Sequence, residues 1–167
     1  MYLTQLPNIM DDNVIDVVKQ AIAYYGVKVS KTEIKKSLYE HPSYPTLKSV
    51  CDSFNRWKIE NYALKLTVSE IKELNMPFIA HLSIMGGFLV FVKKISDDKV
   101  SYIVTGKGRI TESFDDFASK LTGAVIVLNP DKKSIEKDYL YSRQNEIIAE
   151  AVARIFIFRK EKHPGNH

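Results

Sequence analysis

Residues 12–26 read DNVIDVVKQAIAYYG, and this stretch decides how the fold begins. Its apolar side chains recur at intervals of three and four residues, which is the period of a helix that buries one face. Asp12 or Asn13 can cap the helix at its start, and Gly26 stops it. The stretch therefore predicts an amphipathic helix over residues 12–25.

Two more helices are predicted before the pattern changes. Ser30 and Glu33 form a capping-box pattern for a second, short helix. Pro45 fits the first turn of a third helix, whose apolar face carries Cys51 and Trp57. The N-terminal part of the chain is thus expected to be helical throughout.

From residue 59 onward the sequence favours strands. Short helices capped by Thr67 and Ser113 interrupt them, and glycine-containing turns separate them at 85–87 and 106–108. Helices followed by a largely antiparallel sheet predict the α+β class. The predicted strands cover residues 59–66, 78–83, 88–95, 99–105 and 124–128.

The composition is that of an ordinary globular domain. The 167 residues are 45% hydrophobic and 26% charged, which is enough to build one core. The net charge is +4, but basic and acidic residues interleave, so we expect no nucleic-acid partner. A single cysteine excludes an internal disulfide and a cysteine-based metal site, and we expect neither a metal nor a cofactor. With no signal sequence and no long apolar run, we expect a cytoplasmic location and no membrane span.

The pattern of the chain changes after residue 130. Residues 1–130 follow the globular pattern, whereas residues 131–167 are first polar, then apolar (IIAEAVARIFIF) and finally basic. We predict a helical, partly amphipathic tail over this second region. Such a helix either packs back on the domain or meets a partner or a membrane surface.

The order of these elements, with its local motifs, resembles the leader-peptidase domain of bacteriocin and peptide ABC exporters. That domain is a papain-like cysteine peptidase that cuts leader peptides after a double glycine. The Tyr24-Tyr25-Gly26 motif ends the first helix at the family's distance from Asn13, with no gap. The resemblance covers about residues 5–130 and implies a papain-like fold. Other matching pieces are residues 77–81 (PFIAH), 88–92 (FLVFV), 99–108, 115–117 and 123–130.

One branch of that family resembles the chain more closely still. Residues 41–47 (HPSYPTL) and 59–61 (IEN) carry this second resemblance. In that branch the domain precedes a vitamin K epoxide reductase-like membrane domain in Bacteroidetes-type bacteria. The resemblance implies a peptide or protein partner, such as a membrane transporter or a redox protein, and a place at the inner membrane surface.

The resemblance puts three catalytic roles on residues that cannot perform them. Asn13 falls on the nucleophilic cysteine, and an amide cannot form an acyl-enzyme. Gly87, or Gly86 with a one-residue shift, falls on the histidine base, and Thr105 falls near the aspartate that orients it. Gln5 is a possible oxyanion remnant about two residues too far upstream. We therefore expect a pseudo-peptidase rather than an enzyme.

What the scaffold is expected to retain is a groove that holds a peptide. Dead relatives, as the resemblance implies, keep the cleft and use it to hold peptide near a transporter. The residues expected to line the groove are Asn13, Tyr44, Trp57, Gly86 and Gly87.

Two other functions compete with peptide binding. One is an accessory domain of a thiol-redox membrane system, acting by protein contact. The other is an active thiol hydrolase that uses Cys51. This cysteine lies on an apolar helix face, where burial is expected to raise the pKa of its thiol and leave it inert.

Overall fold

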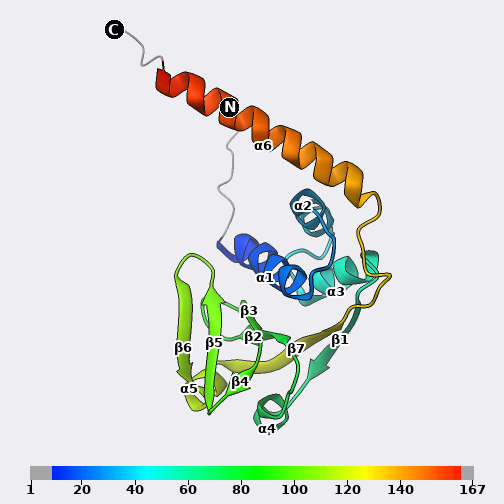
Figure 1. Ribbon diagram of the computed structural model, residues 1–167. Coiled ribbons are helices and arrows are strands. Elements are labelled where there is room, and N and C mark those ends of the chain that lie inside the picture. Colours follow the sequence, from blue (N-terminus) through cyan, green and yellow to red (C-terminus); the bar gives the residue numbers. More distant parts are fainter. Residues whose placement is uncertain (1–8, 163–167) are drawn as a thin grey trace.

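The structure, a computed structural model, describes residues 9–162 of the chain. Three helices come first and lie together on one side of the molecule (Figure 1). They are α1 (Ile9–Tyr25), α2 (Lys31–Tyr39) and α3 (Leu47–Arg56). Strands and two short helices follow: β1 (Glu60–Lys65), α4 (Val68–Lys72), β2 (Phe78–Leu82), β3 (Phe88–Val92), β4 (Ile95–Ser96), β5 (Lys99–Val104), β6 (Gly108–Ser113), α5 (Phe114–Ala118) and β7 (Leu121–Asn129). A long helix, α6 (Tyr139–Lys162), ends the described chain.

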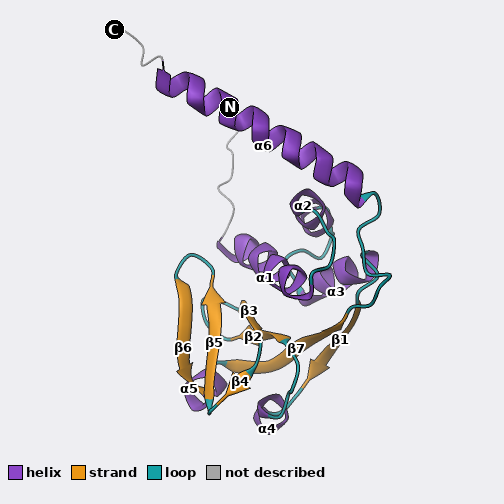
Figure 2. Cartoon of the chain, viewed as in Figure 1, coloured by secondary structure: helices purple, strands orange, loops and turns teal. Residues whose placement is uncertain are grey.

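The strands form two antiparallel sheets beneath α1, α2 and α3 in the view of Figure 2. The larger sheet has the order β1-β7-β2-β3, and the smaller one has the order β4-β5-β6. Contacts between β3 and β5 bring the two sheets together. Helices packed on a mainly antiparallel sheet confirm the predicted α+β class.

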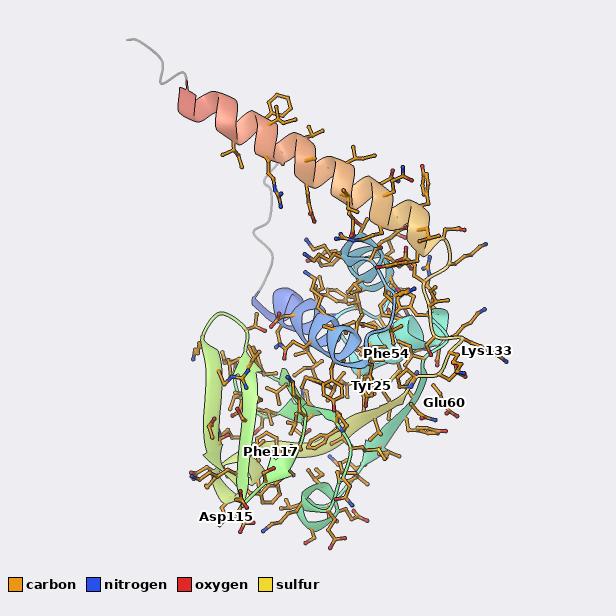
Figure 3. The ribbon with its side chains drawn as sticks, in the orientation of Figure 1. Tyr25, Phe54, Glu60, Asp115, Phe117 and Lys133 are labelled. Atoms are coloured by element: carbon orange, nitrogen blue, oxygen red, sulfur yellow. The ribbon has the colours of Figure 1, made fainter. Side chains whose placement is uncertain are left out.

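Alternation along the strands divides the interior into two cores, because successive side chains of a strand point to opposite faces. Ile79 and Leu89 face the three helices, where they join the fully buried Phe54 and Trp57. Their neighbours on β2 and β3 face the smaller sheet and pack with Phe117 of α5. Figure 3 labels Phe54 among the helices and Phe117 near the smaller sheet. Each large side chain buried in this way stabilises the fold by about 1.5–3 kcal/mol.

Local sequence signals placed several helix starts, with three corrections. α1 begins at Ile9, so Asp12 and Asn13 lie inside the helix and do not cap it. Thr67 and Glu70 form the complete capping box at the start of α4. At α2, only half of the expected box forms: the Ser30 hydroxyl accepts from the Glu33 N–H at 3.1 Å, while the Glu33 carboxylate points to Arg56 of α3. The third helix begins at Leu47 with Thr46 as its N-cap, and Pro45 belongs to the preceding turn.

The strand prediction missed β6 and was wrong at two boundaries. Residues 88–95 were expected to form one strand, but β3 ends at Val92 and Ile95 begins the separate β4. β7 begins at Leu121, three residues earlier than predicted, because Gly123 allows the strand to continue. Gly123 has a φ of +89°, and a Cβ there would lie 2.8 Å from the Leu66 carbonyl oxygen, so only glycine fits.

Packing on the domain continues past the boundary expected after residue 130. The Ile135 N–H donates to the Trp57 carbonyl at 3.0 Å. The buried Glu136 carboxylate accepts from the Ser30 N–H at 2.6 Å and so caps α2. α6 then contacts α2, where the Thr32 N–H donates to Glu146 at 2.7 Å.

Candidate functional site

The first described side chain of α1 connects the helix to the sheet. Asn13 is only 1% exposed. Its Oδ1 accepts from the Leu89 N–H of β3 at 2.8 Å, and its Nδ2 donates to the Leu89 carbonyl at 2.9 Å. β3 lies at the edge of its sheet, so its outer backbone groups have no neighbouring strand of that sheet to bond. The Asn13 amide bonds the N–H and the carbonyl of Leu89 as a residue on such a strand would.

A short chain of hydrogen bonds extends from Asn13 toward the surface. Asn13 Nδ2 also donates to the Thr105 hydroxyl at 3.3 Å, and this hydroxyl donates to Asp16 Oδ2 at 2.8 Å. Gln20, one turn further along α1, donates to the same Asp16 oxygen at 3.1 Å. Every member of the chain has a partner, so the network fixes α1 against β3 and the turn after β5.

A groove of about 610 Å³ opens beside this network. We call it the α1 groove. It is bounded by α1, α2 and the β5–β6 hairpin, and it contains one carboxylate and two lysines together with apolar wall. The lining residues used below are Asp16 and Lys19 of α1, Lys35 and Tyr39 of α2, and Ile103 and Thr105 of the hairpin.

A second hollow of about 300 Å³ lies next along α1 and shares Ile103 with the α1 groove. Its wall is more aromatic. Tyr24 of α1 and Phe91 of β3 meet edge to face with their ring centroids 5.6 Å apart, and Lys93 lies over the Tyr24 ring. The two hollows together offer a polar region followed by an apolar one.

The positions that the resemblance assigns to catalysis do meet in space, in part. Asn13 and Thr105 are in direct contact. Gly87 immediately precedes β3, two residues from the Leu89 backbone that Asn13 binds. Gly86 lies in the exposed turn before it. The fourth position, Gln5, lies outside the described residues.

Three of the residues expected to line a peptide groove are placed differently from that expectation. Trp57 is 0% exposed in the helical core, and its indole N–H donates to Glu33 at 3.3 Å, so a peptide on the surface cannot reach it. Asn13 is buried within its own hydrogen bonds and does not line the groove. Tyr44 is half-buried against the helical core and stacks edge to face on Tyr39, which does line the groove.

The one cysteine of the chain lies away from this site. Cys51 is half-buried on α3 and packs against the helical core. Burial raises the pKa of its thiol, and the neighbouring Asp52 carboxylate raises the pKa further. The His41 ring lies 3.0 Å from that carboxylate and accepts the Ser43 N–H, so it is engaged in its own loop.

Sequence reasoning missed the residues that give the groove its chemistry. Asp16 interrupts the apolar helix 12–25, and its four-residue spacing to Gln20 was the available signal for a polar pair on one helix side. Ile103 gave no signal, because its place in the wall depends on how the hairpin approaches α1. Within residues 9–162, no group of histidine, cysteine and carboxylate side chains could hold a metal. In the same part of the chain, no helix has the length and apolar character needed to cross a bilayer.

Comparison with known proteins identifies the fold. The sequence pattern described as the Peptidase C39 family matches residues 14–133. The structure is similar to a double-glycine motif protease from an AMS/PCAT transporter, solved in complex with the leader peptide, with a TM-score of 0.64 at 15% identity over 78% of this chain and 91% of that one.

Two further solved structures share this architecture. The peptidase domain of Streptococcus ComA, a bifunctional ABC transporter of a quorum-sensing pathway, has a TM-score of 0.62 at 17% identity over 75% of this chain and 96% of that one. The peptidase C39-like domain of a toxin secretion ATP-binding protein from Vibrio parahaemolyticus has a TM-score of 0.57 at 16% identity, over 71% and 97%. No curated protein sequence matches the chain. The family pattern spans most of the described domain, and the chain belongs to the Peptidase C39 family.

Proposed function

We propose that this chain binds an extended peptide in the α1 groove and does not cleave it. The observation that carries the proposal is the state of Asn13: its amide is buried and bonded to Leu89 and Thr105, while the groove beside it is open. A side chain in this position serves the scaffold rather than a reaction.

The chemistry of the residues supports the absence of cleavage. An acyl-enzyme requires a nucleophile with a base in hydrogen-bond reach. Asn13 offers an amide, Gly87 has no side chain, and among the described residues that line the α1 groove there is neither a cysteine nor a histidine. Cys51, the only thiol in the sequence, is half-buried on α3 with a raised pKa.

The shape of the site supports a peptide as the ligand. From Ile15 to Tyr24 the two hollows follow α1 for about 14 Å at 1.5 Å per residue. An extended peptide rises about 3.3 Å per residue, so this length accommodates roughly four residues. Lys19 and Lys35 favour a carboxylate on the peptide, and the hollow at Phe91 favours an apolar side chain.

The relatives indicate which peptides to test. The double-glycine motif protease named above was solved with its leader peptide, and the similar domains belong to ABC transporters and a secretion protein. We therefore assign this chain an exported or leader-type peptide as ligand and an export system as partner.

Binding of labelled double-glycine leader peptides, followed by fluorescence anisotropy, tests the proposal. Ile103→Glu places a charge in the wall that both hollows share, and we expect the affinity to fall by about tenfold or more. Leu64→Glu makes the same kind of change on the exposed strand β1 and is the matched control. Equal affinity of both variants, with circular dichroism confirming that both are folded, would place the peptide elsewhere or nowhere.

A contact-only role in a thiol-redox membrane system stands second. The segment of residues 41–47 and the C-terminal tail motivate this role. The His41 ring bonds Asp52 and the Ser43 N–H, and Tyr44 packs against the core, so this segment is explained by local structure. The open α1 groove has no such local explanation, which favours peptide binding.

A further inference from the structure

The last helix of the chain exposes apolar side chains along its whole described length. Eight large apolar residues of α6, from Leu140 to Ile157, are between 46% and 82% exposed. The helix contacts α2 near its beginning, and its C-terminal half extends away from the other elements (Figure 1). Side chains stand out from this half on several sides in Figure 3. Exposure of this extent marks a surface that has a partner.

One polar contact with α2 orients α6, and an ion pair within α6 supports it. Glu146 accepts from the Thr32 N–H of α2 at 2.7 Å and pairs with Arg143 at 3.1 Å. At about 100° per residue, Ile148 and Ile155 lie about 200° and 180° around the helix from Glu146. These two side chains therefore point away from the domain that holds the helix.

The distribution of apolar residues suits a lipid phase better than a second helix. Between residues 147 and 157, only Glu150 and Arg154 are charged. Residues 155–157 read Ile-Phe-Ile, three exposed apolar side chains in succession. A partner helix covers one narrow stripe of such a segment, whereas the bilayer interface takes up a broader apolar face.

The charge of this region complements an anionic surface. Residues 147–162 contain four basic and two acidic residues, and the basic ones gather at the end, in Arg-Lys-Glu-Lys (residues 159–162). Lys31 and Lys35 are exposed on the neighbouring α2. Basic residues that follow an apolar helix segment attract anionic headgroups, and the apolar residues then enter the interface.

We propose that α6 lies in the interface of an anionic membrane, with Ile148 and Ile155 toward the lipid, and holds the domain at that surface. The test is flotation of the full chain with vesicles of phosphatidylcholine alone or mixed with phosphatidylglycerol at about two to one. The expected result is binding to the mixed vesicles that weakens with salt and falls about tenfold or more in the double variant Ile148→Glu, Ile155→Glu.

The matched control carries the same two charges elsewhere. Tyr62→Glu with Leu64→Glu changes two exposed residues of β1 and is expected to float like the unchanged chain. Circular dichroism checks that both double variants are folded. As a second measurement, Phe156→Trp is expected to shift its emission to the blue on mixed vesicles, while Trp57 stays buried and unchanged.

Three results would overturn the proposal. The chain could fail to float with any vesicle, or float equally with phosphatidylcholine alone. The α6 double variant could float as well as the unchanged chain. The unchanged chain could instead form a dimer in light scattering that Ile148→Glu with Ile155→Glu abolishes, which would assign the face to a second copy of the chain.

Discussion

Replacing Asn13 with alanine removes the side chain that satisfies two backbone groups of β3. The Leu89 N–H and carbonyl, 2.8 Å and 2.9 Å from the Asn13 amide atoms, would both lose this partner in a buried setting. A buried polar group left without a partner costs about 1–3 kcal/mol, so two cost about 2–6 kcal/mol. Alanine returns about 0.5 kcal/mol as a better helix former, which leaves a net loss of about 1.5–5.5 kcal/mol.

Urea unfolding followed by circular dichroism measures this loss. Asn75→Ala, the same change on an exposed loop residue, is the matched control and is expected to stay within about 0.5 kcal/mol of the unchanged chain. Since small domains are stable by about 5–15 kcal/mol, the Asn13 variant should unfold at clearly lower urea. If both variants unfold at the same midpoint, Asn13 does not hold the helix to the sheet and the account of the site is wrong.

The remaining predictions concern the hydrogen bond of Thr105, the reactivity of Cys51 and the contact between α6 and α2. Thr105→Val removes the hydroxyl that donates to Asp16 and should cost about 1 kcal/mol in the same unfolding assay. Cys51 should react with iodoacetamide more slowly in the folded chain than in urea at the same pH, because burial raises the pKa of its thiol. Burial tends to raise the pKa of Glu146, but hydrogen bonds from the Thr32 N–H and from Arg143 hold it below its ordinary 4.5. Its stabilisation is therefore complete above pH 4.5 and is lost as the pH falls through the lowered pKa. Glu146→Gln should reduce stability at neutral pH and match the unchanged chain in acid.

Each of these predictions has a result that contradicts it. An unchanged midpoint for Thr105→Val would mean that the bond from the Thr105 hydroxyl to Asp16 in the folded chain is no stronger than its bond to water in the unfolded chain. Equal alkylation rates in the folded and unfolded chain would reopen Cys51 as a reactive thiol. If the loss of stability caused by Glu146→Gln instead grew in acid, the pH dependence would have the opposite sign. The contact of Glu146 with α2 would then not stabilise the fold.

Local signals in the sequence predicted the parts of the fold that depend on neighbours in the chain. Thr67 and Glu70 are three residues apart and cap α4 as expected, because a capping box is complete within one turn. The apolar period predicted α1 and its buried face. The same period marked Trp57 as apolar on α3, but it could not separate a groove wall from a fully buried core position.

The parts that could not be predicted are long-range contacts. Asn13 and Leu89 are 76 residues apart, and Asn13 and Thr105 are 92 apart, so no local pattern announces their bonds. The resemblance to a known family brought these positions together, and the structure shows which groups the Asn13 amide bonds. The groove itself exists because the β5–β6 hairpin stands off α1, which is a property of packing and not of either segment alone.

The most direct test of the account is one mixture of the chain with a labelled double-glycine leader peptide, read by anisotropy for binding and by mass spectrometry for cleavage. We expect a bound peptide that keeps its full mass through prolonged incubation, and weaker binding in Ile103→Glu. A cleaved product that is formed by the unchanged chain and lost in Cys51→Ala would contradict the account, because the chain would then be an active peptidase whose nucleophile lies outside the α1 groove.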